Sequence, residues 1–245
     1  MPRSARAKST TDIYHAMLRG INYQQIFNDS EDYEKFISIL QDCKNLSGFK
    51  LYAYCLMGNH IHLLLKTEAE DLSQIFKRIG TRYASWYNRK YNRTGHLFQD
   101  RYKSEPVEDD GYFTTVLCYI HNNPVKAGLT KTAKSYKYSS YSEYVGVSKI
   151  TDTTFALNLI GEKEFDNLHK TEFVIFCFDE KPSRLSDEDA RELMYKLVGY
   201  RSAEDFQKLN NTERDTRIKK LKIAGMTIRQ INRLTGVSKG IVERV

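Results

Sequence analysis

Two histidines lie one residue apart in the segment MGNHIHLLL, residues 57–65, which otherwise has the composition of a buried strand. Alternate residues of a strand point to the same side of a sheet, so His60 and His62 share one face and Ile61 and Leu63 share the other. Two imidazoles on one face can bind a single metal cation. A hydrogen-bonded structural pair fits the same pattern, because a buried imidazole needs a polar partner.

A phenol and a carboxamide lie four residues apart in LCYIHNNPVKAGL, residues 117–129. On a helix this spacing places Tyr119 and Asn123 on one face and His121 on roughly the opposite side. Pro124 is expected to end the helix just after Asn123. A tyrosine oxygen can act as a nucleophile and an amide oxygen as a metal ligand, so this pair could complete a site with the two histidines. A packed aromatic residue, one of 17 tyrosines, is the other interpretation.

The elements that would position these side chains follow from hydrophobic patterning. The spacing predicts strands and helices in the order strand, helix, hairpin, helix, strand, and the Gly58-Asn59 pair is typical of a two-residue hairpin turn. This is the ferredoxin-like βαββαβ arrangement, an α+β fold with helices on one face of an antiparallel sheet and the other face free to carry a site. The expected strands are 13–20, 50–57, 60–67 and 97–107, and the expected helices are 30–48, 72–91 and 109–122.

The charge is concentrated at the C-terminal end of the chain. The net charge is +7, and residues 214–245 contain nine Lys and Arg against one Asp and one Glu, which is 9 − 2 = +7, so the rest of the chain is neutral. A basic module attached to a neutral body is typical of nucleic-acid binding, although a solvated basic helix has the same composition.

Composition excludes several other classes of protein. The four cysteines are far apart and form no CxxC pair, which argues against a disulfide framework or a structural zinc site. No apolar run reaches the roughly 18 residues of a membrane helix, and the N-terminus lacks the apolar stretch of a secretory signal. We therefore expect a cytoplasmic protein with no membrane partner.

Several ordered motifs carry a family resemblance. The segments are HAMLRGINYQQIFNDSEDYEKF, MGNHIHLLL, GHLFQDRYKS, VEDDGYF and YIHNNPVKAGL, which together span about residues 12–145. This stretch resembles the single-tyrosine transposases of the HUH superfamily, and in particular the REP-associated tyrosine transposases related to the smallest bacterial insertion sequences. Asp100 and the pair Asn22-Tyr23 depart from the family pattern, which weakens any transfer of substrate details.

The resemblance implies a site and a reaction. His60 and His62 would be the metal-binding pair, Asn123 the third ligand and Tyr119 the nucleophile. The reaction would cleave single-stranded, hairpin-forming DNA through a 5′-phosphotyrosine intermediate and then transfer the strand. The family uses Mg²⁺ or Mn²⁺, whereas histidine ligands alone would suit Zn²⁺ equally well. The resemblance also implies a bacterial protein associated with the nucleoid. Relatives occur as monomers and as homodimers, so both states stay open.

Basic residues in two regions are candidates for DNA binding. In the N-terminal region they lie on the helix 72–91 and the strand 97–107, and in the tail they lie on helices with the spacing of a helix-turn-helix, which would bind duplex DNA. A helical bundle that merely packs is the alternative for the tail. The expected domains are a catalytic domain (1–145), a helical connection (146–182) and a DNA-binding domain (183–245). The candidates are Arg82, Arg101, Lys103, Arg229, Arg233, Lys239 and Arg244.

Two further functions remain to be distinguished. A non-catalytic DNA-binding regulator derived from a transposase would bind DNA without forming covalent adducts. A zinc hydrolase that uses the two histidines would need a carboxylate or a third histidine nearby, for which Glu105 and Asp109 are candidates.

Overall fold

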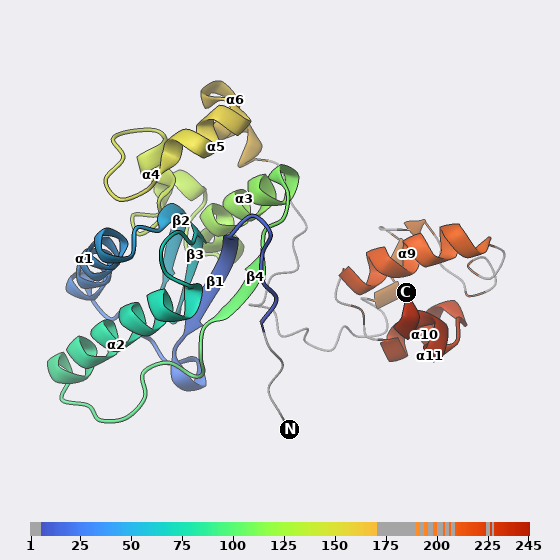
Figure 1. The fold of residues 1–245 in the computed structure, drawn as a ribbon, viewed down its shortest axis with the longest axis horizontal. Helices are drawn as coiled ribbons and strands as arrows, with labels where there is room; N and C mark the ends of the chain where they lie inside the picture. Colours follow the sequence, from blue (N-terminus) through green and yellow to red (C-terminus); the bar gives the residue numbers. More distant parts are fainter. Residues whose placement is uncertain are drawn as a thin grey trace. The chain divides into compact units, whose positions relative to one another are not determined.

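The computed structural model describes residues 6–170 and, in the C-terminal part, residues 190–191, 194–195, 198–199, 203, 206, 209–223, 226 and 228–245. The chain divides into two compact units, Met1–Phe173 and Val174–Val245, and each is described by itself (Figure 1). The expected domain boundary at 182/183 lies outside the described residues, and the boundary at 145/146 stays a prediction. No helix in the part of the chain that the structure describes is long and apolar enough to cross a membrane.

A four-stranded antiparallel sheet forms the centre of the first unit (Figure 1). Its strands are β1 (Ile13–Arg19), β2 (Lys50–Met57), β3 (His60–Lys66) and β4 (Lys103–Pro106), in the order β2-β3-β1-β4. The Gly58-Asn59 turn joins β2 to β3, as the sequence predicted. Strand β4 is shorter than the expected 97–107, because only Lys103–Pro106 pair continuously with β1, and Phe98 forms an isolated bridge with Gly20.

Two helices cover one face of this sheet. Helix α1 (Ser30–Ser47) begins with a capping box formed by Asp29 and Asp32 and ends at Gly48, whose φ of 71° suits a residue without a Cβ. Helix α2 (Leu72–Lys90) packs beside α1, and both bury apolar side chains against those of the strands. The α+β, ferredoxin-like arrangement predicted from the sequence is confirmed.

A third long helix covers the opposite face. Helix α3 (Asp110–Lys126) packs against β2 and β3, so the expectation that this face is free is wrong. Pro124 lies inside the helix rather than just after it, because it is in the last turn and removes only one backbone donor. The turn still closes, since the Ala127 N–H donates to the Asn123 carbonyl at 2.9 Å.

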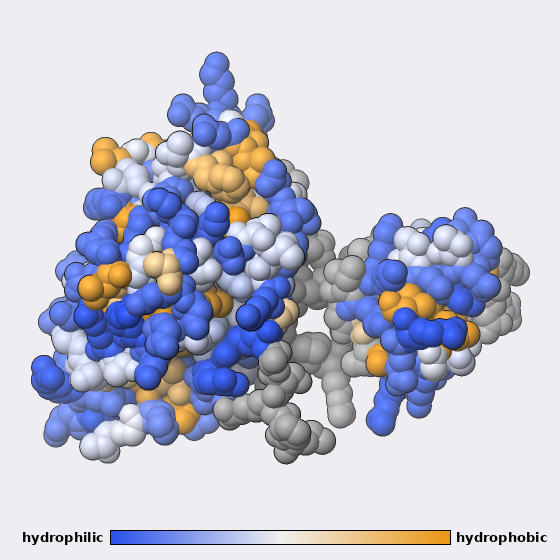
Figure 2. Space-filling model, viewed as in Figure 1, coloured by the Kyte–Doolittle hydropathy of each residue, from blue (hydrophilic) through white to orange (hydrophobic). Residues whose placement is uncertain are grey.

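Short helices complete the first unit: η1 follows β1, and the others form a layer outside α3. They are η1 (Ile21–Tyr23), η2 (Ala133–Ser135), α4 (Tyr141–Tyr144), α5 (Thr153–Ile160) and α6 (Glu162–Leu168). The buried carboxylate of Glu143 fixes this layer by accepting hydrogen bonds from the Tyr54 hydroxyl and from the backbone N–H groups of residues 149–151. Figure 2 shows apolar surface over α5 and α6, where Phe155 and Leu159 are exposed.

The second unit is helical where it is described. It contains α9 (Asn211–Ile223), α10 (Ile228–Thr235) and α11 (Lys239–Arg244), and Gly236 with φ 71° lies in the turn between the last two. Ile231, Leu234 and Val237 are buried in a small core of this unit. Ser238 occupies the N-cap position of α11 without a side-chain cap hydrogen bond. A DNA-reading helix-turn-helix stays a prediction.

Candidate active site

His62 lies on β3 at the centre of the sheet, opposite Met17 of β1 and Cys55 of β2. Its side chain is fully buried and faces α3, because the alternating residues Ile61 and Leu63 face α1 and α2. The His62 Nδ1 is 2.9 Å from the Nε2 of His15, also fully buried. The sheet therefore holds an imidazole pair beneath α3.

His15 is a site residue that the sequence reasoning missed. It lies on β1, two residues before Met17, and its ring is tilted by 31° against that of His62. The available signal was its position in a strand that is otherwise almost entirely apolar, where a buried imidazole requires a partner. The partner could not be identified without the strand register.

His60 occupies the first position of β3 and is only partly buried. Its Nδ1 is 2.6 Å from the Oδ1 of Asn59, the last residue of the hairpin turn. An amide oxygen only accepts hydrogen bonds, so the Nδ1 of His60 carries a proton, and in the neutral imidazole the lone pair is then on Nε2. The turn residue therefore fixes the tautomer of the histidine that follows it.

The same tautomer follows for His62 from its two neighbours. The Asn123 Nδ2 is 3.3 Å from the His62 Nε2, and an amide N–H donates to a ring nitrogen only if that nitrogen has a lone pair. The Nδ1 of His62 then donates to His15. Both His60 and His62 thus present an Nε2 lone pair, the form in which a neutral imidazole binds a metal.

Helix α3 supplies the remaining groups of the cluster. Asn123 and Tyr119 face the sheet from successive turns, and both are buried, with 7% and 8% of their surface exposed. The Tyr119 ring lies edge-on to the rings of His62 and His15, with centroids 5.7 and 5.9 Å away. The structure therefore brings together the two pairs that the sequence grouped separately, His60 with His62 and Tyr119 with Asn123.

These groups fit a divalent ion with an incomplete protein ligand set. Two cis ligands of an octahedral ion about 2.1 Å away are about 3 Å apart, close to the 3.3 Å between His62 and the Asn123 amide. Rotating that amide by 180° would present its oxygen without moving the backbone. Within the described residues, no group of three His, Cys, Asp or Glu side chains could hold a metal ion. His15 does not supply the third histidine that a zinc hydrolase would need, because its Nε2 faces the Nδ1 of His62 and not the Nε2 that would bind the metal.

Charged side chains surround the cluster. The Lys126 Nζ is 5.8 Å from the centroid of the Tyr119 ring, and Lys103 and Glu105 are on β4, opposite Met17 and His15. Burial raises the pKa of Glu105, which accepts a hydrogen bond from the Tyr112 hydroxyl at 3.0 Å. The cations on this face suit a phosphate backbone.

The predicted DNA-binding residues are distributed differently. Lys103 shares the sheet face of His62, and Arg101 is exposed just before β4. Arg82 lies on α2, across the sheet from Tyr119, and its NH1 is 3.9 Å from the Asp42 carboxylate, so the structure does not bring it to the cluster. In the second unit the predicted residues are all exposed: Arg229, Arg233, Lys239 and Arg244.

A second histidine pair lies on the other side of α3. The His121 Nδ1 is 2.8 Å from the His169 Nε2, and the His121 Nε2 is 2.8 Å from the Ser140 hydroxyl. The His169 Nδ1 donates to the Phe165 carbonyl at 2.8 Å. Burial lowers the pKa of both histidines. As the helical spacing predicted, His121 does not join the Tyr119 cluster.

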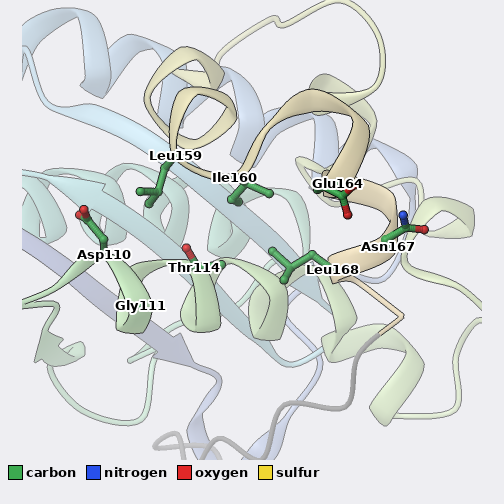
Figure 3. A pocket seen from close by; sticks show the side chains of 8 residues that line it. All are labelled: Asp110, Gly111, Thr114, Leu159, Ile160, Glu164, Asn167 and Leu168. Atoms are coloured by element: carbon green, nitrogen blue, oxygen red, sulfur yellow. The ribbon is translucent and has the colours of Figure 1, made fainter.

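The outer side of α3 also forms a hollow of about 430 Å³ with α5 and α6. Figure 3 shows the side chains that line it: Asp110, Thr114, Leu159, Ile160, Glu164, Asn167 and Leu168, with the backbone of Gly111. None of the four clustered residues lines this hollow.

Comparisons with known proteins agree with this geometry. Residues 8–123 match the family described as IS200-like transposases. A Haemophilus influenzae protein whose name assigns it to the REP-associated tyrosine transposases is 30% identical over 113 residues, which cover 41% of this chain and 63% of that relative. The resemblance expected from the sequence motifs is therefore confirmed.

One solved structure confirms the fold, and a second is a weaker match. A REP-associated tyrosine transposase bound to a REP hairpin has a TM-score of 0.51 at 16% identity, covering 63% of this chain and 96% of its own. A Deinococcus radiodurans protein named for a transposase has a TM-score of 0.36 at 21% identity, covering 49% and 97%.

Proposed function

From the resemblance to IS200-like transposases over residues 8–123, we propose that this chain is a DNA nuclease and strand transferase acting on single-stranded, hairpin-forming DNA. One observation carries the proposal. Tyr119 and Asn123 from α3 meet His62 from β3, with the tyrosine ring edge-on to an imidazole whose Nε2 is 3.3 Å from the amide. The hairpin DNA bound by the structural relative is consistent with this choice of substrate.

The proposed ligands of a Mg²⁺ or Mn²⁺ ion are the Nε2 atoms of His60 and His62 and the side-chain oxygen of Asn123. When bound, the ion would neutralise charge that develops on the scissile phosphate. Asn59 and His15 hold the two imidazoles in the required tautomer. The few protein ligands leave room for phosphate oxygens and water.

The reaction that we propose is an exchange of phosphoester bonds. The Tyr119 oxygen forms a bond to phosphorus, the bond from phosphorus to the 3′ oxygen breaks, and the phenol proton ends on that 3′ oxygen. The products are a 5′-phosphotyrosine and a free 3′ hydroxyl. Lys126, 5.8 Å from the Tyr119 ring centroid, favours the negative charge that the phenol oxygen gains as its proton leaves. Attack by the 3′ hydroxyl of another strand reverses the reaction and joins that strand.

DNA is held by two regions in this proposal. Lys103 and Arg101, near the cluster, contact the phosphates of the single strand. In the second unit the exposed cations of α10 and α11, namely Arg229, Arg233, Lys239 and Arg244, contact duplex DNA.

The test is incubation of the full chain with a single-stranded hairpin oligonucleotide and Mn²⁺. We expect a covalent protein–DNA complex that survives denaturing gel electrophoresis and that Tyr119→Phe and His62→Ala both abolish. Tyr112→Phe is the matched control on the same helix, because the Tyr112 hydroxyl donates to Glu105. It should retain the complex.

Two results would contradict the proposal. A Tyr119→Phe protein that still traps DNA would remove the nucleophile from the mechanism. Tight DNA binding by the unaltered chain with no covalent complex in Mn²⁺ or Mg²⁺ would favour a DNA-binding regulator instead.

A further inference from the structure

The turn that follows β1 has an unusual backbone conformation. Asn22 and Tyr23 have φ values of 51° and 61°, in the left-handed region that residues with a Cβ rarely adopt. A tight approach fixes the turn, because a Cβ at Gly20 would lie 2.3 Å from the Gln24 carbonyl oxygen. For a bulky aromatic such as Tyr23 this conformation costs free energy, which the surrounding contacts must offset.

The strained residue exposes its side chain rather than burying it. Tyr23 is 47% exposed, a high value for a large aromatic side chain in this chain. The guanidinium carbon of Arg19 is 5.0 Å from the centroid of its ring, within the range of a cation–π contact. One face of the ring is therefore supported by a cation, and the side chain offers a flat aromatic surface to solvent.

Hydrogen bonds connect this surface to the candidate active site. The Asn59 Nδ2 donates to the Tyr23 carbonyl at 3.3 Å, and the Oδ1 of the same amide accepts from His60 at 2.6 Å. The Gly20 N–H donates to the Asn59 carbonyl at 2.9 Å. Arg19 is also directly opposite His60 in the strand register. The position of the Tyr23 ring is thus tied to a proposed metal ligand.

We propose that Tyr23 is a stacking platform for one unpaired nucleobase of the single strand, with Arg19 supporting the ring and contacting the adjoining phosphate. Every base has a π-face that can stack on tyrosine, whereas a duplex keeps those faces covered. The inference takes only its ligand, single-stranded DNA, from the proposed function. It requires neither cleavage nor metal.

The test measures equilibrium binding of a single-stranded oligonucleotide without chemistry. The full chain carries Tyr119→Phe in every sample, and EDTA replaces the metal. Tyr23→Ala should weaken binding about 5- to 150-fold, the range for loss of one base–aromatic stack, and Tyr23→Trp should restore it. A series of oligonucleotides that each lack one base then locates the stacked base. When that base is the missing one, Tyr23→Ala should not weaken binding further, whereas at every other position it should.

Glycine substitutions separate stacking from backbone strain. Asn22→Gly relieves the left-handed conformation next to Tyr23 and should leave DNA binding unchanged. Tyr23→Gly also relieves strain and should lose binding like Tyr23→Ala, without a lower melting temperature of the unit reported by Trp86, the only tryptophan in the chain.

Each outcome is decisive. The proposal that Tyr23 is a stacking platform is wrong if the Tyr23→Ala protein binds single-stranded DNA as tightly as the parent. It is also wrong if Tyr23→Ala weakens binding equally whichever base is missing. A parent protein that binds no single-stranded DNA overturns both this inference and the proposed function, whereas normal binding by the parent with an unaffected Tyr23→Ala overturns this inference alone.

Discussion

Two histidine pairs lie on opposite sides of α3, and they differ in what their ring nitrogens face. In the pair formed by His121 and His169, each ring nitrogen has a fixed partner in the protein, including a serine hydroxyl and a backbone carbonyl. In the pair formed by His15 and His62, the outward Nε2 of His62 faces the Asn123 amide, which can rotate. The pair formed by His15 and His62 also lies beside His60, which is partly exposed.

The partners of the ring nitrogens distinguish a structural histidine from a candidate metal ligand. Both pairs have nitrogens 2.8–2.9 Å apart, and His62 and His121 are both fully buried. Burial and pairing therefore do not separate them. The two pairs differ because the Nε2 lone pair of His62 faces an amide that a metal ion could displace, and a candidate nucleophile, Tyr119, lies beside it.

The largest expected effect comes from the same substitution in each pair. His62→Gln should lower the affinity for Mn²⁺ by about 100-fold or more, because it removes a proposed ligand, with a smaller change in melting temperature. His121→Gln should leave Mn²⁺ affinity unchanged and lower stability by about 1–3 kcal/mol, because His169 and Ser140 lose a well-placed partner. Titration calorimetry and thermal melts monitored by Trp86 measure the two effects. An equal loss of Mn²⁺ affinity in both variants would show that His62 and His121 do not differ as metal ligands.

A smaller effect is expected at His15, which contacts the proposed ligand His62 but is not a proposed ligand itself. His15→Leu removes the acceptor for the His62 Nδ1–H and should weaken Mn²⁺ binding about 10- to 100-fold. His15→Gln retains an acceptor oxygen and should restore much of that affinity. If His15→Leu binds Mn²⁺ as tightly as the parent protein, His15 only fills space in the core.

The smallest effect is the pH dependence of the second pair. Burial lowers the pKa of His169 below its ordinary value of 6.5, so the unfolded chain binds a proton more readily than the folded one. The stability from this group is therefore present above pH 6.5 and is lost as the pH falls towards the folded-state pKa, by at most about 1.4 kcal/mol per pH unit. Urea unfolding monitored by Trp86 at pH 7.5, 6.5 and 5.5 should show this slope. His169→Gln should flatten it, and an unchanged slope would assign the pH dependence to other groups.

Much of the fold could be predicted because local patterning is strong. The hairpin, β1, α1 and α2 agree with the sequence within a residue or two, since each has a clear period and a cap or turn residue at its end. Strand β4 and the end of α3 could not be predicted as well. Pairing with β1 decides how far β4 extends, and packing on the sheet carries α3 past Pro124.

The residues of the candidate site likewise divide into those that the sequence could predict and those that it could not. Spacing grouped His60 with His62 and Tyr119 with Asn123, because alternation in a strand and a four-residue step in a helix decide which side chains share a face. The family resemblance then assigned the two groups to one site. Asn59, His15 and Tyr23 could not be selected in this way. Their roles depend on a turn, on the register between β1 and β3, and on a left-handed backbone conformation.

The sequence by itself determined which side chains share a face within one strand or one helix, because that follows from the local backbone period. Tertiary packing alone shows that α3 covers the histidine face, that His15 is the partner of His62, and that His121 pairs with His169. These contacts join residues 47 to 61 positions apart in the chain. Strand register and helix packing set them, and neither is encoded in the spacing of a single element.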